Sequence, residues 1–507
     1  RVIAIESERE FGLSVMQRLD AELQHRGNVF RDAGVQDLGG YRDRADRDST
    51  LPPIPRILFV VDEFQEFFVA DDKISQDAAL LLDRLVRQGR AFGIHVLLGS
   101  QTLGGAYSLA RSTLGQMAIR IALQCSEADA HLILSEDNTA ARLLNRPGEA
   151  IYNDANGRIE GNNPFQIVWL PDHEREEYLH RLRERFQKEL VSTPPTVIFE
   201  GNAPSSLANN PHVADALAGK LSSRRILSAW LGEPIEIKPP TAIEFARQSG
   251  SHLVVLGQDG TSARGVFVSS LVSLALQSRL AKASSSVDTS PNANTHSSLA
   301  CRLYLLDGTD PAQVDTQGGL VLLAEFARNA GIEATSIDRR RLTDSLSEIA
   351  EIISRRQLQE SPDPEEIFLF IYDLGRFRDL RRGEDDFGFS MNSEGDAPAK
   401  PDKILASIVR DGPPLGVHVV VWADSLASFQ RSFDRQSMRE FGSRILFQMS
   451  VTDSSQLMDG PQASRLGPHR AYLHQEDVGR LEKFRPYAVP DADWLKRVAD
   501  LVVESQA

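Results

Sequence analysis

Two adjacent carboxylates, Asp62 and Glu63, directly follow the apolar run 57–61. An uninterrupted apolar run of this length is typical of a buried parallel strand. Ligands of open α/β sheets bind beyond the carboxyl ends of the strands, so acids placed there can serve a metal ion and a water molecule. Asp62 would then hold Mg²⁺ through water, and Glu63 would polarise the water that attacks the γ-phosphate of ATP. The alternative is a strand that happens to end in two solvated acids.

A second strand with a polar tip is predicted within residues 88–102, where a glycine-punctuated turn precedes a buried apolar run. Gln101 lies at the polar tip. If the two strands are neighbours, Gln101 can contact the γ-phosphate or the attacking water and report whether hydrolysis has occurred. A third strand, predicted over residues 118–124, carries Arg120 in an otherwise apolar run.

These residues resemble the FtsK/SpoIIIE family of P-loop motors, within the larger group that includes the HerA helicases. The resemblance covers residues 1 to about 190, and its motifs follow the order and approximate spacing of the family. They are Val61-Asp62-Glu63-Phe64, Gly89-Arg90-Ala91, Gly93-Ile94-His95, Ser100-Gln101, Arg120-Ile121 and the turn Pro147-Gly148-Glu149-Ala150.

The resemblance implies an α/β fold of tandem RecA-like P-loop NTPase domains with mostly parallel central sheets flanked by helices. It also implies ATP and Mg²⁺ as cofactors. In ring motors of this family an arginine from one subunit completes the neighbour's site, so Arg120 is the candidate finger, with a structural ion pair as the alternative. The sequence contains no GxxxxGK[ST] loop, so the phosphate loop of the first domain is expected upstream of residue 1.

The same landmarks recur later in the chain. A strand over residues 251–256 leads into a glycine-containing stretch that stands where a phosphate loop belongs, but the family's lysine is absent and Arg264 lies nearby. An arginine can also bind phosphate. The candidate nucleotide contacts of this degenerate loop are Gly257, Gly260, Ser262 and Arg264.

The acidic strand also recurs, over residues 367–373, but with a single acid. Leu374 stands where the catalytic glutamate is expected, and Asp424 stands where Gln101 stood. We therefore expect a second domain that kept the fold and lost hydrolysis.

The composition, 507 residues with 41% hydrophobic and 25% charged, suits a soluble globular protein with two or more domains. The net charge of −15 argues against a surface that coats nucleic acid. Two cysteines far apart indicate a reducing, cytoplasmic setting, and no apolar run approaches the ~20 residues that span a bilayer. The expected parts are a first ATPase module (1–190), a connector (191–240), a degenerate second module (241–490) and a tail (491–507).

The sequence therefore predicts an ATP-driven motor subunit that forms a homo-oligomeric ring and moves a polymer. Double-stranded DNA is the default polymer of the family. Tandem modules with inactive sites look more like the ATPases of type VII secretion, which would move secreted protein substrates and associate with a membrane through upstream segments. A third alternative is a scaffold that binds nucleotide without hydrolysing it.

Overall fold

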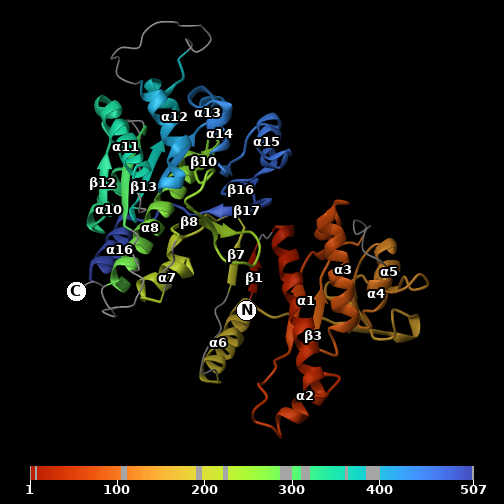
Figure 1. Cartoon of the computed structure of the whole chain (residues 1–507). Coiled ribbons are helices and arrows are strands. Elements are labelled where there is room, and N and C mark those ends of the chain that lie inside the picture. Colours follow the sequence, from red (N-terminus) through yellow and green to blue (C-terminus); the bar gives the residue numbers. More distant parts are fainter. Residues whose placement is uncertain are drawn as a thin grey trace. The chain divides into compact units, whose positions relative to one another are not determined.

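The chain divides into two compact units, Arg1–Gly201 and Asn202–Ala507, which are described separately (Figure 1). The structure is a computed structural model. It describes residues 2–5, 8–103, 111–189, 197–201, 203–220, 226–285, 300–309, 320–359, 363–383 and 400–504.

The described strands of the first unit form three small sheets. Strands β1 and β7 pair in parallel, β2 and β3 pair in parallel, and β4, β5 and β6 form an antiparallel sheet. The strands are β1 (Val2–Ile5), β2 (Ile57–Val61), β3 (Ile94–Leu98), β4 (Arg120–Leu123), β5 (Glu149–Asn153), β6 (Asn162–Gln166) and β7 (Val197–Glu200). The helices are α1 (Arg9–Asp32), α2 (Leu38–Ala45), α3 (Lys73–Gln88), α4 (Arg111–Gly115), α5 (Glu127–Ile133) and α6 (Asp172–Glu189).

Helices α1 and α3 form a core with one face of the β2–β3 pair. Helix α3 begins where the Asp72 side chain accepts from the Ser75 backbone N–H at 2.9 Å. It buries Ala78, Leu82 and Leu85, whose spacing places them on one side of the helix. The opposite face of the two strands is exposed, so this pair of strands is covered on one side only.

The second unit is built on one ten-stranded sheet with the order β12-β11-β13-β14-β10-β15-β16-β17-β8-β9. In this order, the neighbours from β12 through β11, β13, β14 and β10 to β15 pair in parallel. The remaining neighbours, from β15 to β9, pair antiparallel. The strands are β8 (Ser228–Pro234), β9 (Thr241–Glu244), β10 (Leu253–Leu256), β11 (Cys301–Asp307), β12 (Glu333–Ser336), β13 (Glu366–Tyr372), β14 (Val417–Ala423), β15 (Ser443–Leu446), β16 (Ala471–Gln475) and β17 (Arg480–Pro486).

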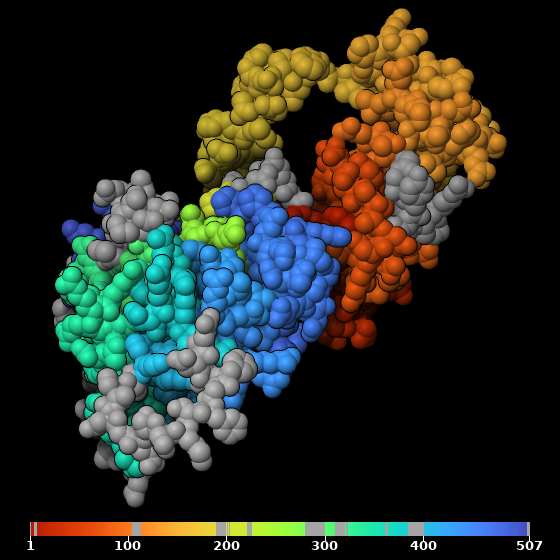
Figure 2. Space-filling view, turned by 90° about the horizontal axis from the view of Figure 1, so that it is seen from above, coloured from red at the N-terminus to blue at the C-terminus, as the bar shows by residue number. Residues whose placement is uncertain are grey.

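Helices cover both faces of this sheet, which is why every residue of β10, β13 and β14 is buried. One core joins the sheet to α7, α8, α10 and α16, and the other joins it to α11, α12, α13 and α15. In Figure 2 the green, cyan and blue segments of this unit form one continuous body. The helices are α7 (Pro211–Leu217), α8 (Gly260–Ser285), α10 (Val321–Asn329), α11 (Leu342–Gln357), α12 (Pro401–Asp411), α13 (Leu426–Ser432), α14 (Arg435–Arg439), α15 (Val451–Met458) and α16 (Ala492–Glu504).

The stretch expected as a connector, 191–240, is divided between the two units. Strand β7 pairs with β1 in the first unit, whereas β8 pairs with β9 and β17 in the second. The stretch expected as a tail, 491–507, contains α16, whose Leu495 and Val498 are buried in the core of the second unit. Both differences arise from long-range pairing and packing, which the local sequence pattern does not reveal. Across the described ranges, no helix combines the length and apolar character that a membrane crossing needs.

Candidate functional site

Asp62 and Glu63 lie at the carboxyl end of β2, as predicted from the sequence. Glu63 has a left-handed backbone (φ 51°) and precedes a short 3₁₀ helix, η1 (Phe64–Phe68). This conformation is uncommon for a residue with a side chain, and it persists because Phe64 and Phe68 anchor the following turn in the core. The backbone N–H of Glu63 donates to Asp62 Oδ1 at 3.0 Å. Both carboxylates are exposed, so a hydrated cation has access to them.

Gly99, the first residue after β3, has no side chain and therefore leaves room for the Asp62 carboxylate. A Cβ atom at this position would stand 2.9 Å from Asp62 Oδ1, closer than side chains normally approach. The Gly99 backbone also ties the two strand ends together, because its N–H donates to the Val61 carbonyl at 2.8 Å. A side chain at position 99 would therefore shift the Asp62 carboxylate from its present place.

Gln101 and Glu63 are brought into direct contact, 38 residues apart in sequence. Gln101 Nε2 donates to Glu63 Oε1 at 2.5 Å. A carboxylate in this position can accept a proton from water, and the amide can orient that carboxylate or the water itself. Asp62 supplies the hard oxygen ligand that Mg²⁺ prefers, so the three side chains fit a magnesium-dependent hydrolytic site. Bound Mg²⁺ would neutralise charge on the phosphates during hydrolysis.

Arg120, the first residue of β4, is surrounded by backbone carbonyls of its own unit. Its guanidinium donates to the carbonyls of Leu134 and Ile133, at the end of α5, and to that of Met117 at 3.1 Å. Burial lowers the pKa of Arg120. The structural alternative predicted from the sequence was an ion pair, and the partners in the structure are neutral carbonyls instead. This geometry favours a structural role for Arg120.

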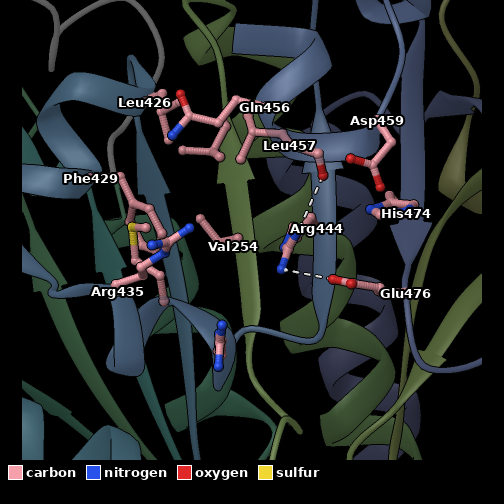
Figure 3. A pocket seen from close by; sticks show the side chains of 13 residues that line it. Val254, Leu426, Phe429, Arg435, Arg444, Gln456, Leu457, Asp459, His474 and Glu476 are labelled. Carbon is pink, nitrogen blue, oxygen red and sulfur yellow. Dashed lines mark hydrogen bonds and ion pairs between the residues drawn. The ribbon is translucent and has the colours of Figure 1, made fainter.

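Arg444 makes the equivalent contacts in the second unit, on strand β15. It donates to the Leu457 carbonyl at 3.0 Å, near the end of α15, and it lies 3.5 Å from a carboxylate oxygen of Glu476. Figure 3 shows both contacts at the edge of a cavity that Val254 and Phe429 also line. The strand arginine thus holds the end of the following helix in both units.

The predicted phosphate loop of the second unit begins at Gly257, whose φ of 126° requires glycine. Helix α8 starts at Gly260. The Asp259 carboxylate accepts from the backbone N–H of Ser262 at 3.0 Å, so an acid already occupies a donor of this helix terminus. A carboxylate there takes the place that a phosphate would need and repels it.

Arg264, the predicted phosphate contact, is buried beside the ring of Tyr372. Its exposed fraction is 4%, and its guanidinium carbon lies 5.6 Å from the centre of the Tyr372 ring. A buried guanidinium stacked on an aromatic ring is held by that ring. The geometry therefore gives Arg264 an internal partner.

The strand pairing defines which residues of the two units correspond. Ile57 and Ile367 each lie opposite the first residue of the neighbouring strand, β3 or β14. Tyr372 follows Ile367 by the same number of residues as Asp62 follows Ile57. Tyr372 therefore corresponds to Asp62 of the first unit. The second unit therefore has an aromatic residue at the position of the proposed magnesium ligand.

The backbone supports the same alignment. Asp373 (φ 56°) shares the left-handed conformation of Glu63 and likewise precedes a 3₁₀ helix, η7 (Leu374–Arg376). The sequence-based expectation that Asp373 replaces Asp62, and Leu374 replaces Glu63, is therefore wrong by one residue. The cause is that both strands are uniformly apolar, so that their sequences alone do not determine the register.

Tyr372 and Trp422 fill the space at the second unit's strand ends. Their ring centres are 4.6 Å apart, and Trp422 corresponds to Gly99 of the first unit. Trp422 Nε1 donates to the Gly257 carbonyl at 3.0 Å, and the Tyr372 hydroxyl donates to the Gly260 carbonyl at 2.9 Å. Two aromatic rings thus fasten the degenerate loop where the first unit has a small residue and a carboxylate.

Paired acids and an amide beyond parallel strands, with a degenerate copy of the same arrangement, are features that P-loop ATPases share. Comparison with known proteins agrees with this class. Residues 2–104 match the model of the FtsK/SpoIIIE family, which confirms the resemblance found in the sequence.

Two curated relatives show which proteins this chain is similar to. The DNA translocase FtsK of Lactococcus lactis subsp. lactis (strain IL1403) is 22% identical over 266 residues, which cover 50% of this chain and 34% of the relative. The ESX-5 secretion system protein EccC5 of Mycobacterium marinum (strain ATCC BAA-535 / M) is 35% identical over 166 residues, which cover 31% of this chain and 11% of the relative. The chain thus spans about a third or less of the length of these two proteins.

Solved structures share the fold of nearly the whole chain. The cytoplasmic domain of the Thermomonospora curvata type VII secretion ATPase EccC has a TM-score of 0.59 and 19% identity, and the match covers 97% of this chain and 55% of that one. EssC (ATPases 2 and 3) from Geobacillus thermodenitrificans has a TM-score of 0.54 and 16% identity, with 94% and 79% covered. The predicted α/β fold of tandem RecA-like P-loop domains is confirmed.

Proposed function

We propose that this chain is an ATP-hydrolysing motor subunit of the FtsK/SpoIIIE type, with hydrolysis in the first unit. The observation that carries the proposal is the contact between Gln101 and Glu63 beside Asp62. In this proposal Asp62 holds Mg²⁺ through water and Glu63 accepts the proton of the attacking water. Gln101 senses the γ-phosphate or the water, which links the state of the nucleotide to the conformation of the unit.

The phosphate loop of this site would be contributed by polypeptide other than the described residues. In the second unit β10 lies between β14 and β15, and its loop leads into α8. In the described part of the first unit no strand joins the corresponding β3 and β4. The face of β2 and β3 that corresponds to the face covered by α8 in the second unit is exposed. The exposed fractions are 65% for Leu58, 58% for Val60 and 54% for Leu97. An apolar face of this kind suits an added strand and helix.

The second unit would serve as a structural partner that does not hydrolyse ATP. Tyr372, stacked with Trp422, stands at the position that corresponds to Asp62, and the Asp259 carboxylate accepts from the Ser262 backbone N–H at the start of α8. This supports the proposal that hydrolysis is restricted to the first unit, in a homo-oligomeric ring whose other subunits carry the same arrangement. A scaffold without hydrolysis anywhere is disfavoured by the intact contact between Gln101 and Glu63.

Double-stranded DNA is the polymer that we propose first, because a DNA translocase that matches half of this chain is among its relatives. Movement of protein substrates, as the names of the secretion ATPases suggest, is the alternative, and the tandem arrangement with a degenerate copy favours it. The two proposals share the site in the first unit and differ only in the polymer.

ATP turnover by the full-length protein, measured with and without long duplex DNA at about 0.1 M salt, separates these proposals. A DNA motor is expected to turn over ATP severalfold faster with DNA, and higher salt should weaken the stimulation because phosphate contacts release counterions. Turnover that is clear but unaffected by DNA would favour a protein substrate. No turnover under either condition would contradict the proposed hydrolysis.

A further inference from the structure

The loop that carries Gln101 is held by a buried carboxylate from another part of the first unit. Asp129 lies in the first turn of α5, after strand β4, and its exposed fraction is 9%. Its Oδ1 accepts from the backbone N–H of Leu103 at 2.9 Å and from the hydroxyl of Thr102 at 3.0 Å. These donors directly follow Gln101 in the chain, so Asp129 fixes the loop within two residues of the amide.

The Asp129 carboxylate is well suited to hold the loop because its other oxygen is also bonded. Oδ2 accepts from the Ser126 hydroxyl at 2.7 Å. Burial alone would raise the pKa of Asp129, but the bonds from Ser126, Leu103 and Thr102 outweigh burial and hold that pKa below its usual value. The group therefore acts as a charged acceptor, which makes stronger hydrogen bonds than a neutral one.

The other end of the loop is held by the turn that Glu63 begins. The Ser100 hydroxyl lies 2.6 Å from Oε1 of Gln65, a residue of η1 with an exposed fraction of 8%. Leu103 is buried in the same core as Phe64. Gln101 thus stands in a short loop that is fastened on one side to the Glu63 turn and on the other side to α5.

We propose that Asp129 is a positioning residue for ATP hydrolysis, which fixes Gln101 against the Glu63 carboxylate. The inference rests on the proposed function of the first unit. Asp129 does not touch the reacting atoms and acts through the backbone of the loop. The far end of α5 is held by Arg120, through the carbonyls of Ile133 and Leu134, so α5 connects this arginine to the sensor loop.

The second unit shows that the local motif does not by itself produce the contact. Ser450 and Asp453 repeat the cap made by Ser126 and Asp129, with the backbone N–H of the aspartate donating to the serine hydroxyl at 3.1 Å in both units. Among the described residues, the Asp453 carboxylate receives no hydrogen bond from the loop that carries Asp424. The clamp therefore occurs in the unit with the proposed catalytic site.

Asp129→Ala is expected to lower kcat for ATP about tenfold in the full-length protein and to leave KM within about twofold, because a displaced Gln101 affects the chemical step more than binding. Hydrogen exchange of the segment 99–103 is expected to become faster. Asp129→Asn is expected to fall between Asp129→Ala and the wild type, since its amide oxygen can accept the same two bonds but carries no charge. Thr102→Val, a milder change, is expected to lower kcat about two- to threefold.

Asp453→Ala is the matched control and is expected to leave kcat unchanged. Wild-type kcat in Asp129→Ala, or an equal loss in Asp129→Ala and Asp453→Ala, would overturn the inference. If the wild type itself shows no turnover, the proposed function fails, and hydrogen exchange alone still tests the clamp. Unchanged exchange of the segment 99–103 in Asp129→Ala would then refute it. If Asp129→Ala does not fold, wild-type kcat in Thr102→Val would refute it as well.

Discussion

Glu63→Gln is expected to lower kcat for ATP hydrolysis by about 10²- to 10⁴-fold, the range that a positioned general base contributes. The amide has nearly the same shape as the carboxylate and can still bond to Gln101, but it cannot accept the proton of the attacking water. The dissociation constant for ATP is expected to stay within about threefold of the wild type, because the carboxylate is needed only in the chemical step. Steady-state turnover and equilibrium binding of a labelled nucleotide measure the two quantities.

Glu66→Gln provides the matched control for this change. Glu66 is an exposed acid in the same 3₁₀ turn, so the variant removes the same charge a few residues away. Its kcat is expected to equal that of the wild type. Turnover of Glu63→Gln within about twofold of the wild type would refute the assignment of Glu63 as the general base of ATP hydrolysis.

Arg120→Ala is expected to destabilise the first unit by about 3 kcal/mol, because it leaves several backbone carbonyls near the end of α5 without their charged donor. For a unit of this size the loss corresponds to a Tm lower by about 6–12 °C. Differential scanning calorimetry measures the change. ATP turnover is expected to fall as well, since α5 also carries Asp129 and thus holds the Gln101 loop.

Mixing Arg120→Ala with Glu63→Gln distinguishes this structural role from a finger that acts on a neighbouring subunit. A structural Arg120 predicts no recovery of turnover in mixed rings. A finger in trans predicts recovery, because some interfaces would combine an intact Glu63 with an intact Arg120. Recovered turnover together with an unchanged Tm of Arg120→Ala would refute the structural role. Arg444→Ala, the equivalent change in the second unit, is expected to lower the Tm, because it removes the donor to the Leu457 carbonyl.

The sequence predicted those parts of the site that depend on local pattern. An apolar run followed by Asp62 and Glu63 identified the strand and its acids, and the glycine turn before β3 identified the strand that carries Gln101. Their contact follows from the rule that the carboxyl ends of neighbouring parallel strands meet. Repeated landmarks predicted two related modules, and the chain divides into two compact units at a boundary other than the expected ones.

The remaining features depend on contacts between distant segments. The sequence around Asp129 does not indicate its contact, and only the fold places this residue against Leu103. A serine three residues before it is the single local signal, and it indicates a helix cap instead of a clamp. The partners of Arg120 could not be predicted either, because every residue has a backbone carbonyl and the sequence does not indicate which ones an arginine contacts.

The second unit shows why a repeat in sequence does not define a repeat in chemistry. The acid that survives, Asp373, corresponds to Glu63, while the position of Asp62 is taken by Tyr372. Arg376 lies 3.3 Å from the Asp373 carboxylate, and burial raises the pKa of this aspartate. An acid that is paired and lacks a metal ligand beside it is poorly suited to activate water.

ATP turnover by Asp373→Asn in the full-length protein tests most directly whether hydrolysis is confined to the first unit, because Asp373 occupies the position in the second unit that Glu63 occupies in the first. If hydrolysis takes place in the first unit alone, kcat is expected to stay within about twofold of the wild type. A loss of tenfold or more, with an unchanged Tm, would show that the second unit contributes to hydrolysis and would contradict the account.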